Sequence, residues 1–228
     1  MSKSLSEVSY SIRNQLKGWI ASQNEVISIE FIYKKISDVR SLLLQQWYTD
    51  NKWIDQESYS QVCLEIKCEP IQCYDKHSKA YVDSGMKRYV VNAPFIEQFC
   101  GEQAIKYFGA PDLKHPYAKR SVSGQSFSES DAYTHHEPSF TRIGNRFILE
   151  HLPETGVKFV TLVALFEDVV EVCEPDEVFP FPSHLLHKLE LLVIQQIQAP
   201  AKQMKPSSVS DSTDRSPVTE QTIKQTRE

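Results

Sequence analysis

Three cysteines and a histidine in the first half of the chain are residue types that bind zinc. They are Cys63, Cys68, Cys73 and His77. Zinc sites usually pair their ligands so that one tight turn presents two thiolates. Cys63 and Cys68 instead lie on a strand-like run, where odd and even positions point to opposite faces. The spacing favours ordinary buried or half-buried cysteines, and we expect no metal and no other cofactor.

Two adjacent histidines offer a second place for metal or acid–base chemistry. His135 and His136 lie in a stretch rich in Pro, Ser, Gly and Tyr. Adjacent side chains diverge in an extended chain, so they rarely chelate one ion together. Glu137 could complete such a site only if the loop curls back. The pattern favours a pair of surface histidines.

An acidic stretch in the second half could bind a divalent cation. Its carboxylates are Glu167, Asp168, Glu171, Glu174, Asp176 and Glu177. Calcium loops alternate their oxygen ligands and need a glycine for the sharp turn. This stretch has no glycine, and hydrophobic residues interrupt it. We expect a strand whose charges face solvent, or alternatively a basic neighbour across an interface.

A serine and two histidines follow the prolines at 180 and 182. Ser183, His184 and His187 could supply a nucleophile and a base, but the chain has no G-x-S-x-G motif. Ser183 is better explained as the N-cap of a helix. Walker, dinucleotide-binding and H-E-x-x-H motifs are also absent. We therefore assign no catalytic, cofactor-binding or metal residue and expect a protein that is not an enzyme. A Cys/His metal protein is the less favoured alternative.

Three helices are expected to frame the chain. Ser4 and Glu7 have the spacing of a capping box, and hydrophobic residues follow at helical spacing as far as Trp19. Ser28 is a good N-cap for a second helix with a broad hydrophobic stripe, which ends near residues 49–51. A leucine-rich helix closes the folded part, from Ser183 to about residue 198.

The middle of the chain alternates as strands do. Residues 61–70 have the period of a half-buried strand, which Pro70 either ends or places at a sheet edge. A short strand is expected at 88–91 and a short helix at 94–108. Gly144-Asn145 predicts a two-residue hairpin turn, and residues 157–166 form the most hydrophobic strand.

These elements predict an α+β fold. We expect N-terminal helices in residues 1–60 and a closing helix in 182–198 to pack as a helical bundle, with an antiparallel β-rich insertion at 61–181. Residues 199–228 have few hydrophobic side chains and are expected to be a disordered or extended tail that orders only on assembly.

Composition excludes several classes of protein. The longest hydrophobic run, VKFVTLVALF, is too short to span a bilayer. The net charge of -5, with mixed acidic and basic residues, lacks the basic stripe of a nucleic-acid binder. Five cysteines, an odd number, do not suggest a disulfide framework. We expect a chain made in the cytoplasm, with reduced thiols and no membrane partner.

The order of these features resembles the head-to-tail connector (adaptor or ring) proteins of crAss-like and related short-tailed bacteriophages. The resemblance covers about residues 8–70 and 139–198. Five patterns carry it. They are a helical pattern at Ile32, Ile36, Arg40, Leu43 and Leu44, a β step with proline at Cys68-Glu69-Pro70, an I-G-N-R hairpin at Ile143 to Arg146, an F-E-D strand end at Leu165 to Asp168, and a proline before the last helix, Pro182.

The resemblance implies a structural virion protein made in the host cytoplasm. It implies a ring, expected to be twelvefold, that attaches below the portal protein, continues the DNA channel and docks the tail or further ring proteins. Packaged DNA would pass without sequence-specific binding, and ejection of the genome would run through the ring. Trp47, Trp53 and Tyr59 suit either subunit interfaces or a core. A tail adaptor or another protein-binding virion module is the alternative.

Overall fold

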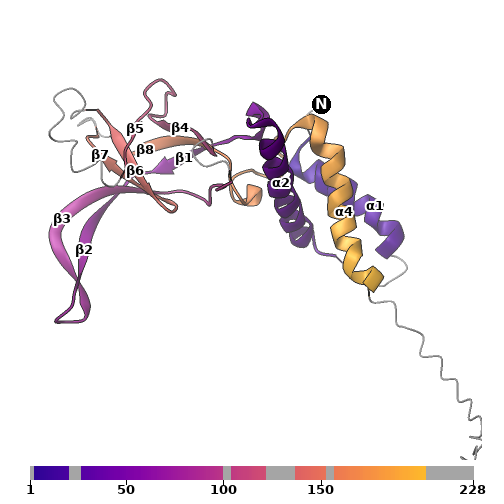
Figure 1. Cartoon of the computed structure of the whole chain (residues 1–228), viewed down its shortest axis with the longest axis horizontal. Coiled ribbons are helices and arrows are strands. Elements are labelled where there is room, and N and C mark those ends of the chain that lie inside the picture. Colours follow the sequence, from indigo (N-terminus) through magenta and orange to yellow (C-terminus); the bar gives the residue numbers. More distant parts are fainter. Residues whose placement is uncertain (1–2, 21–26, 100–103, 122–136, 153–156, 204–228) are drawn as a thin grey trace, which may run out of the picture.

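The structure is a computed structural model that describes residues 3–20, 27–99, 104–121, 137–152 and 157–203. Within these ranges it has an α+β fold, with three helices at one end and two sheets at the other (Figure 1). The predicted tail, beyond residue 203, lies outside the described residues. In the described part, no helix is both long and hydrophobic enough to cross a membrane.

The first two helices begin where the sequence predicts. α1 (Leu5–Ile20) starts with a reciprocal capping box: the Glu7 amide donates to Ser4 Oγ over 3.2 Å, and the Ser4 amide donates to the Glu7 carboxylate over 3.0 Å. α2 (Ile29–Asn51) is capped by Ser28, whose Oγ accepts from the amide of Phe31. It ends at Lys52, whose φ of 62° is left-handed.

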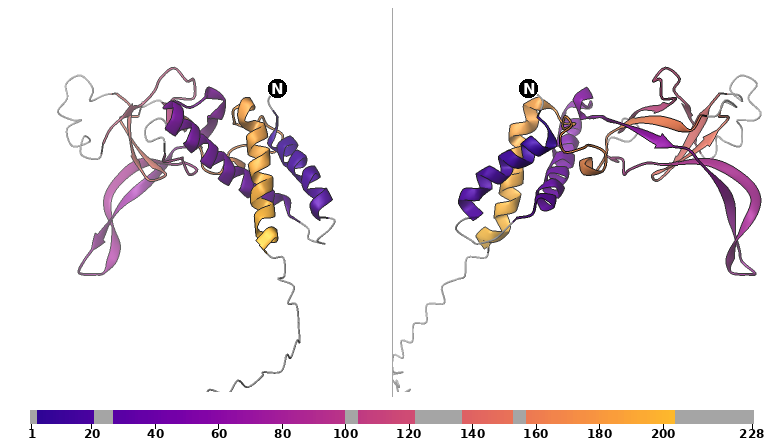
Figure 2. Two further views of the ribbon diagram at one scale, coloured as in Figure 1. Left: turned by 45° about the vertical axis from the view of Figure 1, so that its right-hand side comes forward. Right: turned by 180° about the vertical axis from the view of Figure 1, so that it is seen from behind.

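The three helices pack side by side around one core (Figures 1 and 2). α4 (Leu186–Gln203) follows a 3-10 turn, η4 (Ser183–Leu185), and contacts both α1 and α2. Each helix contributes one hydrophobic face, and the segment before α4 adds Phe179 and Phe181. Burial of these faces supplies most of the helices' stability.

Two small sheets form the other end of the molecule. A three-stranded antiparallel sheet has the order β1 (Ser60–Glu65), β8 (Phe159–Ala164), β4 (Ile105–Gly109). A five-stranded sheet has the order β2 (Lys67–Asp75), β3 (Ala80–Asn92), β7 (Arg146–Glu150), β6 (Ser139–Ile143), β5 (Ala118–Lys119). The β5–β6 pair is parallel, which the antiparallel expectation did not include.

The core between the strands is aromatic at its centre. Phe147 stacks on Phe108 at 4.6 Å between ring centroids, and Phe140 lies against both rings. The predicted turn is confirmed: Gly144 and Asn145 join β6 to β7, and Gly144 has a φ of 62°, which a residue with a Cβ rarely adopts.

The strand predicted over residues 61–70 is wrong in one respect, because it is two strands in two sheets. β1 pairs with β8, whereas β2 pairs with β3. The chain changes sheet at Ile66, whose amide donates to the carbonyl of Lys158 over 2.9 Å. Pro70 lies within β2, and β2 is the outermost strand of its sheet, as the edge alternative predicts.

The short helix predicted over residues 94–108 is also wrong. Ile96 forms an isolated bridge with Phe166, and the amide of Glu97 donates to the carbonyl of Leu165 over 3.0 Å. Further along, β4 pairs with β8. Pairing with a distant strand overrides the local helical preference here.

The acidic stretch is not the predicted strand. It forms a 3-10 turn, η3 (Val169–Glu171), and then irregular turns, while its charges do face solvent as predicted. Val169 and Cys173 are buried in the helical core, which fixes this backbone. Ser183 does not cap α4 through its side chain; its amide donates to the Glu57 carboxylate over 3.3 Å. α4 also runs past the expected boundary at residue 198.

Candidate functional site

The predicted metal candidates do not assemble in the structure. Cys63 lies on β1, and Cys68 and Cys73 lie on β2 in the other sheet, all three exposed. Among the described residues, no group of three or more His, Cys, Asp or Glu side chains could hold a metal ion. His135 and His136 lie outside the described residues, and Glu137 is exposed.

The acidic carboxylates and the histidines near α4 have structural contacts. Asp168 caps η3 by accepting from the Val170 amide over 3.0 Å, and Asp176 accepts from the Ser6 hydroxyl. The His184 ring lies 5.0 Å from the ring of Trp47. Within the described structure, neither His184 nor His187 hydrogen-bonds a serine or cysteine as a base would.

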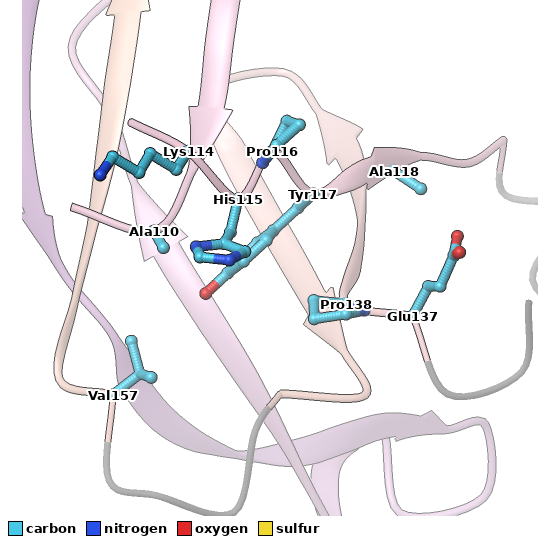
Figure 3. A pocket seen from close by; sticks show the side chains of 9 residues that line it. All are labelled: Ala110, Lys114, His115, Pro116, Tyr117, Ala118, Glu137, Pro138 and Val157. Carbon is cyan, nitrogen blue, oxygen red and sulfur yellow. The ribbon is translucent and has the colours of Figure 1, made fainter. Parts of the chain in front are cut away.

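A hollow beside β5 is lined by His115, the histidine with the contact closest to acid–base chemistry (Figure 3). His115 Nδ1 lies 2.6 Å from the Asp112 carboxylate, a contact that, after the Lys114 amide, helps to hold the pKa of Asp112 below its usual value. Tyr117 lies in the same hollow, and burial raises the pKa of its hydroxyl. No nucleophile from the described residues hydrogen-bonds His115, so the group lacks the arrangement of a nucleophilic site.

The most unusual side chain lies where the helices meet the sheets. Arg40 of α2 is 1% exposed. Its guanidinium donates to three backbone carbonyls: Nε to Pro180 over 3.1 Å, Nη1 to Phe166 over 2.9 Å, and Nη2 to Ser58 over 2.9 Å. These carbonyls belong to the segment that enters β1, the segment that leaves β8 and the segment that leads into α4. We call this arrangement the Arg40 joint.

Other polar contacts of α2 flank the Arg40 joint. The Ser41 hydroxyl donates to the buried carboxylate of Glu97, and the Ser37 hydroxyl donates to Asp168 over 3.2 Å. Burial lowers the pKa of Arg40 to about 10, so it stays charged at neutral pH. We call the three helices the helical bundle and the two sheets the β body. The buried charge of Arg40 links them through three directional hydrogen bonds.

The aromatic residues Trp47, Trp53 and Tyr59, which could suit an interface or a core, differ in burial. Trp47 is half-buried, with its ring edge-on to Trp53 at 5.6 Å. Trp53 is largely exposed, and Tyr59 is half-buried against the ammonium of Lys106. Trp47 therefore packs against rings of its own chain, whereas Trp53 remains available for an interface.

Glu97 should make stability depend on pH. Burial raises its pKa, and the Ser41 hydrogen bond and the Arg40 charge only partly oppose that effect. The folded protein therefore holds a proton that the unfolded chain has already lost between the ordinary and the raised pKa. Stability from this group is present at low pH and falls as the pH rises through that window.

We expect Glu97→Gln to reduce this loss of unfolding free energy with rising pH. Urea unfolding at about pH 4 and about pH 7 should show a smaller loss of unfolding free energy in the variant than in the wild type. Glu171→Gln, at an exposed position, is the matched control and should leave the difference unchanged. Equal losses in wild type and Glu97→Gln would contradict a raised pKa.

A two-stranded arm leaves the β body and points away from the helices (Figures 1 and 2). We define the arm as residues 70–88. β3 pairs with β7 only from Tyr89 onward, so among the described strands β2 and β3 pair only with each other in the arm. At its base, Arg146 of β7 forms an ion pair with Glu69.

The arm bends at a bulge. Between the pairs Pro70–Lys87 and Gln72–Asp83, β2 has one residue and β3 has three. The Ser84 hydroxyl donates to the carbonyl of Ile71 over 2.6 Å, and Gly85 takes a φ of 76°. Such a bulge increases local twist and fixes the register on both sides.

Sequence reasoning missed both the Arg40 joint and the arm. In the sequence Arg40 stands out only as part of a family pattern, although an arginine inside the hydrophobic stripe of a helix indicates a buried charge with partners. The arm has no buried face, so its sequence lacks regular hydrophobic alternation.

Comparison with known proteins settles the family. No curated protein matches the chain. A model of the family described as phage tail ring protein 2 matches residues 7–214. That span includes both sheets, α2, α4 and all of α1 except its first two residues. The chain therefore belongs to the phage tail ring protein 2 family of crAss-like phages.

Proposed function

We propose that this phage tail ring protein is the head-to-tail connector subunit that attaches below the portal. Membership in the family makes the chain a structural virion protein that associates with copies of itself. The position below the portal, the continuation of the DNA channel and the docking of the tail are our proposal. In it the protein performs no catalysis and carries no cofactor.

The observation that carries the proposal is the Arg40 joint. A closed ring uses heterologous interfaces, so each subunit presents two different surfaces at a fixed angle. Here a helical bundle and a β body are such surfaces, and three hydrogen bonds from one buried side chain hold their connecting segments. We propose residues 1–60 with 182–198 and residues 61–181 as the two working units, and 199–228 as a tail that orders in the assembly.

The charge of the chain supports a channel role. The net charge of the whole chain is -5. An acidic surface near the axis would repel packaged DNA and let it slide during ejection rather than bind it. We propose twelve copies, which match a twelvefold portal, with the portal above and the tail or further rings below.

Cryo-electron microscopy of intact particles tests this function. The expected result is a ring of this chain directly below the portal, with density that fits both the helical bundle and the β body. A ring at the far end of the tail would support the tail-adaptor alternative instead. Finding the chain only as monomers bound to neither portal nor tail would contradict both.

A further inference from the structure

We propose that the arm of one subunit docks on the acidic segment of the neighbouring copy in the ring. The acidic segment is residues 167–178, which follow β8. The inference rests on the proposed function only in requiring a ring, and it assigns the surfaces that join adjacent subunits.

The arm has the properties of a segment that is incomplete alone. A lone two-stranded ribbon is marginally stable in water. This one exposes large hydrophobic side chains on both faces, and Tyr81 is 70% exposed. The Tyr74 and Tyr81 rings lie 5.4 Å apart on one face, whereas Val82 lies on the other. Exposed hydrophobic surface of this kind marks a protein contact.

The arm is long enough to reach another subunit. Residues 80–88 of β3 extend past the last pairing with β7, and at about 3.3 Å per residue they span roughly 30 Å. That length is about the diameter of a small domain. Figures 1 and 2 show the arm turned away from the helices of its own chain. The described residues therefore leave the arm largely uncovered, and we place its partner in another subunit.

Charge identifies the part of the neighbouring copy that fits. The arm carries four basic and two acidic residues in a chain of net charge -5. Lys76 and Lys79 lie at its tip, and among the described residues neither forms an ion pair. The acidic segment has the opposite charge, and its carboxylates form no ion pair within the described structure. Opposite potentials of this kind steer association and fix its register.

Hydrophobic residues support the same pairing. Val178 is 63% exposed, and Val170 is also exposed, beside the carboxylates of the acidic segment. They offer nonpolar contact to the arm tyrosines, as at interfaces where aromatic side chains anchor a core within a polar rim. The buried Val169 and Cys173 hold the segment in place, so the surface exists before the neighbour arrives.

Charge reversal in assembled rings tests the pairing. Lys76→Glu with Lys79→Glu in the full chain should reduce the fraction of subunits in rings on the portal at least about tenfold. Glu171→Lys with Glu174→Lys should reduce it similarly, and all four substitutions together should restore rings to within about twofold. Lys17→Glu with Lys34→Glu, at exposed helical positions, is the matched control and should assemble normally.

Two further measurements check that the variants fold and that the two segments are in contact. Urea unfolding of each variant shows whether it folds, and a Lys79→Cys, Glu174→Cys chain should form cross-links between adjacent subunits in the particle. Normal rings from the Lys76→Glu, Lys79→Glu chain, or no cross-link, would overturn the docking. Normal rings that retain less DNA would assign the arm to DNA instead. Rings found away from the portal would leave the docking intact and overturn only the proposed position.

Discussion

Arg40→Met is expected to lower the free energy of unfolding by about 4 kcal/mol. The substitution removes a charged donor from three buried carbonyls, and an unsatisfied buried acceptor costs about 1–3 kcal/mol. Methionine fills part of the volume, so the loss reports the hydrogen bonds more than a cavity. Urea unfolding followed by far-ultraviolet circular dichroism measures the change.

The matched control for Arg40→Met is Arg13→Met on the exposed face of α1. It should change stability by no more than about 0.5 kcal/mol. We also expect Arg40→Met to separate the unfolding of the helices from that of the sheets, so that far-ultraviolet circular dichroism of the helices and hydrogen exchange of the sheet amides no longer report one transition. Equal effects at positions 40 and 13, with one shared transition, would show that the Arg40 joint does not hold the two bodies together.

Phe147→Ala is expected to cost about 4 kcal/mol through the β body. Phe147 is 0% exposed and packs between Phe108 and Phe140, so truncation leaves a cavity that a small sheet cannot close. Equilibrium unfolding in urea gives the loss directly. Circular dichroism at helical wavelengths then shows whether the helices outlast the sheets.

Phe159→Ala is the control for Phe147→Ala, because it removes the same ring from a β8 position that is 47% exposed. It should cost less than about 1 kcal/mol. If both phenylalanine variants lose the same stability, the aromatic core does not carry the β body.

The features that local rules decide could be predicted from the sequence. Ser4 and Ser28 cap their helices because a side-chain oxygen must satisfy free amides at the first turn. Gly144 turns the hairpin because its φ is positive. These choices depend on residues within one turn of each other, and the sequence displays them directly.

The features that distant partners decide could not be predicted. The alternation of residues 61–70 is the same in one strand as in two, so it does not mark the change of sheet at Ile66. Ile96 pairs with Phe166, and β4 to β8 lie between them in the chain, so no local signal predicts that bridge. The acidic stretch did hold a usable sign, since Val169 and Cys173 are spaced for one face of a helical turn.

The candidate functional residues also differ in whether local sequence or distant partners decide their role. Reactive residue types drew attention to Cys63, Cys68 and Cys73, which the structure leaves apart on exposed strands. Arg40 has no distinctive chemistry of its own, and its importance comes from three carbonyls that lie 18, 126 and 140 residues away along the chain.

The bulge in the arm has a consequence for the dimensions of an assembly. Because Ser84 and Gly85 fit only one alignment of the two strands, sliding one strand past the other would break the bulge. The distance from β7 to the tip is therefore the same in every copy. If each arm reaches the neighbouring copy, its constant length sets the same spacing between every pair of adjacent subunits. The circumference of the ring then follows from that spacing.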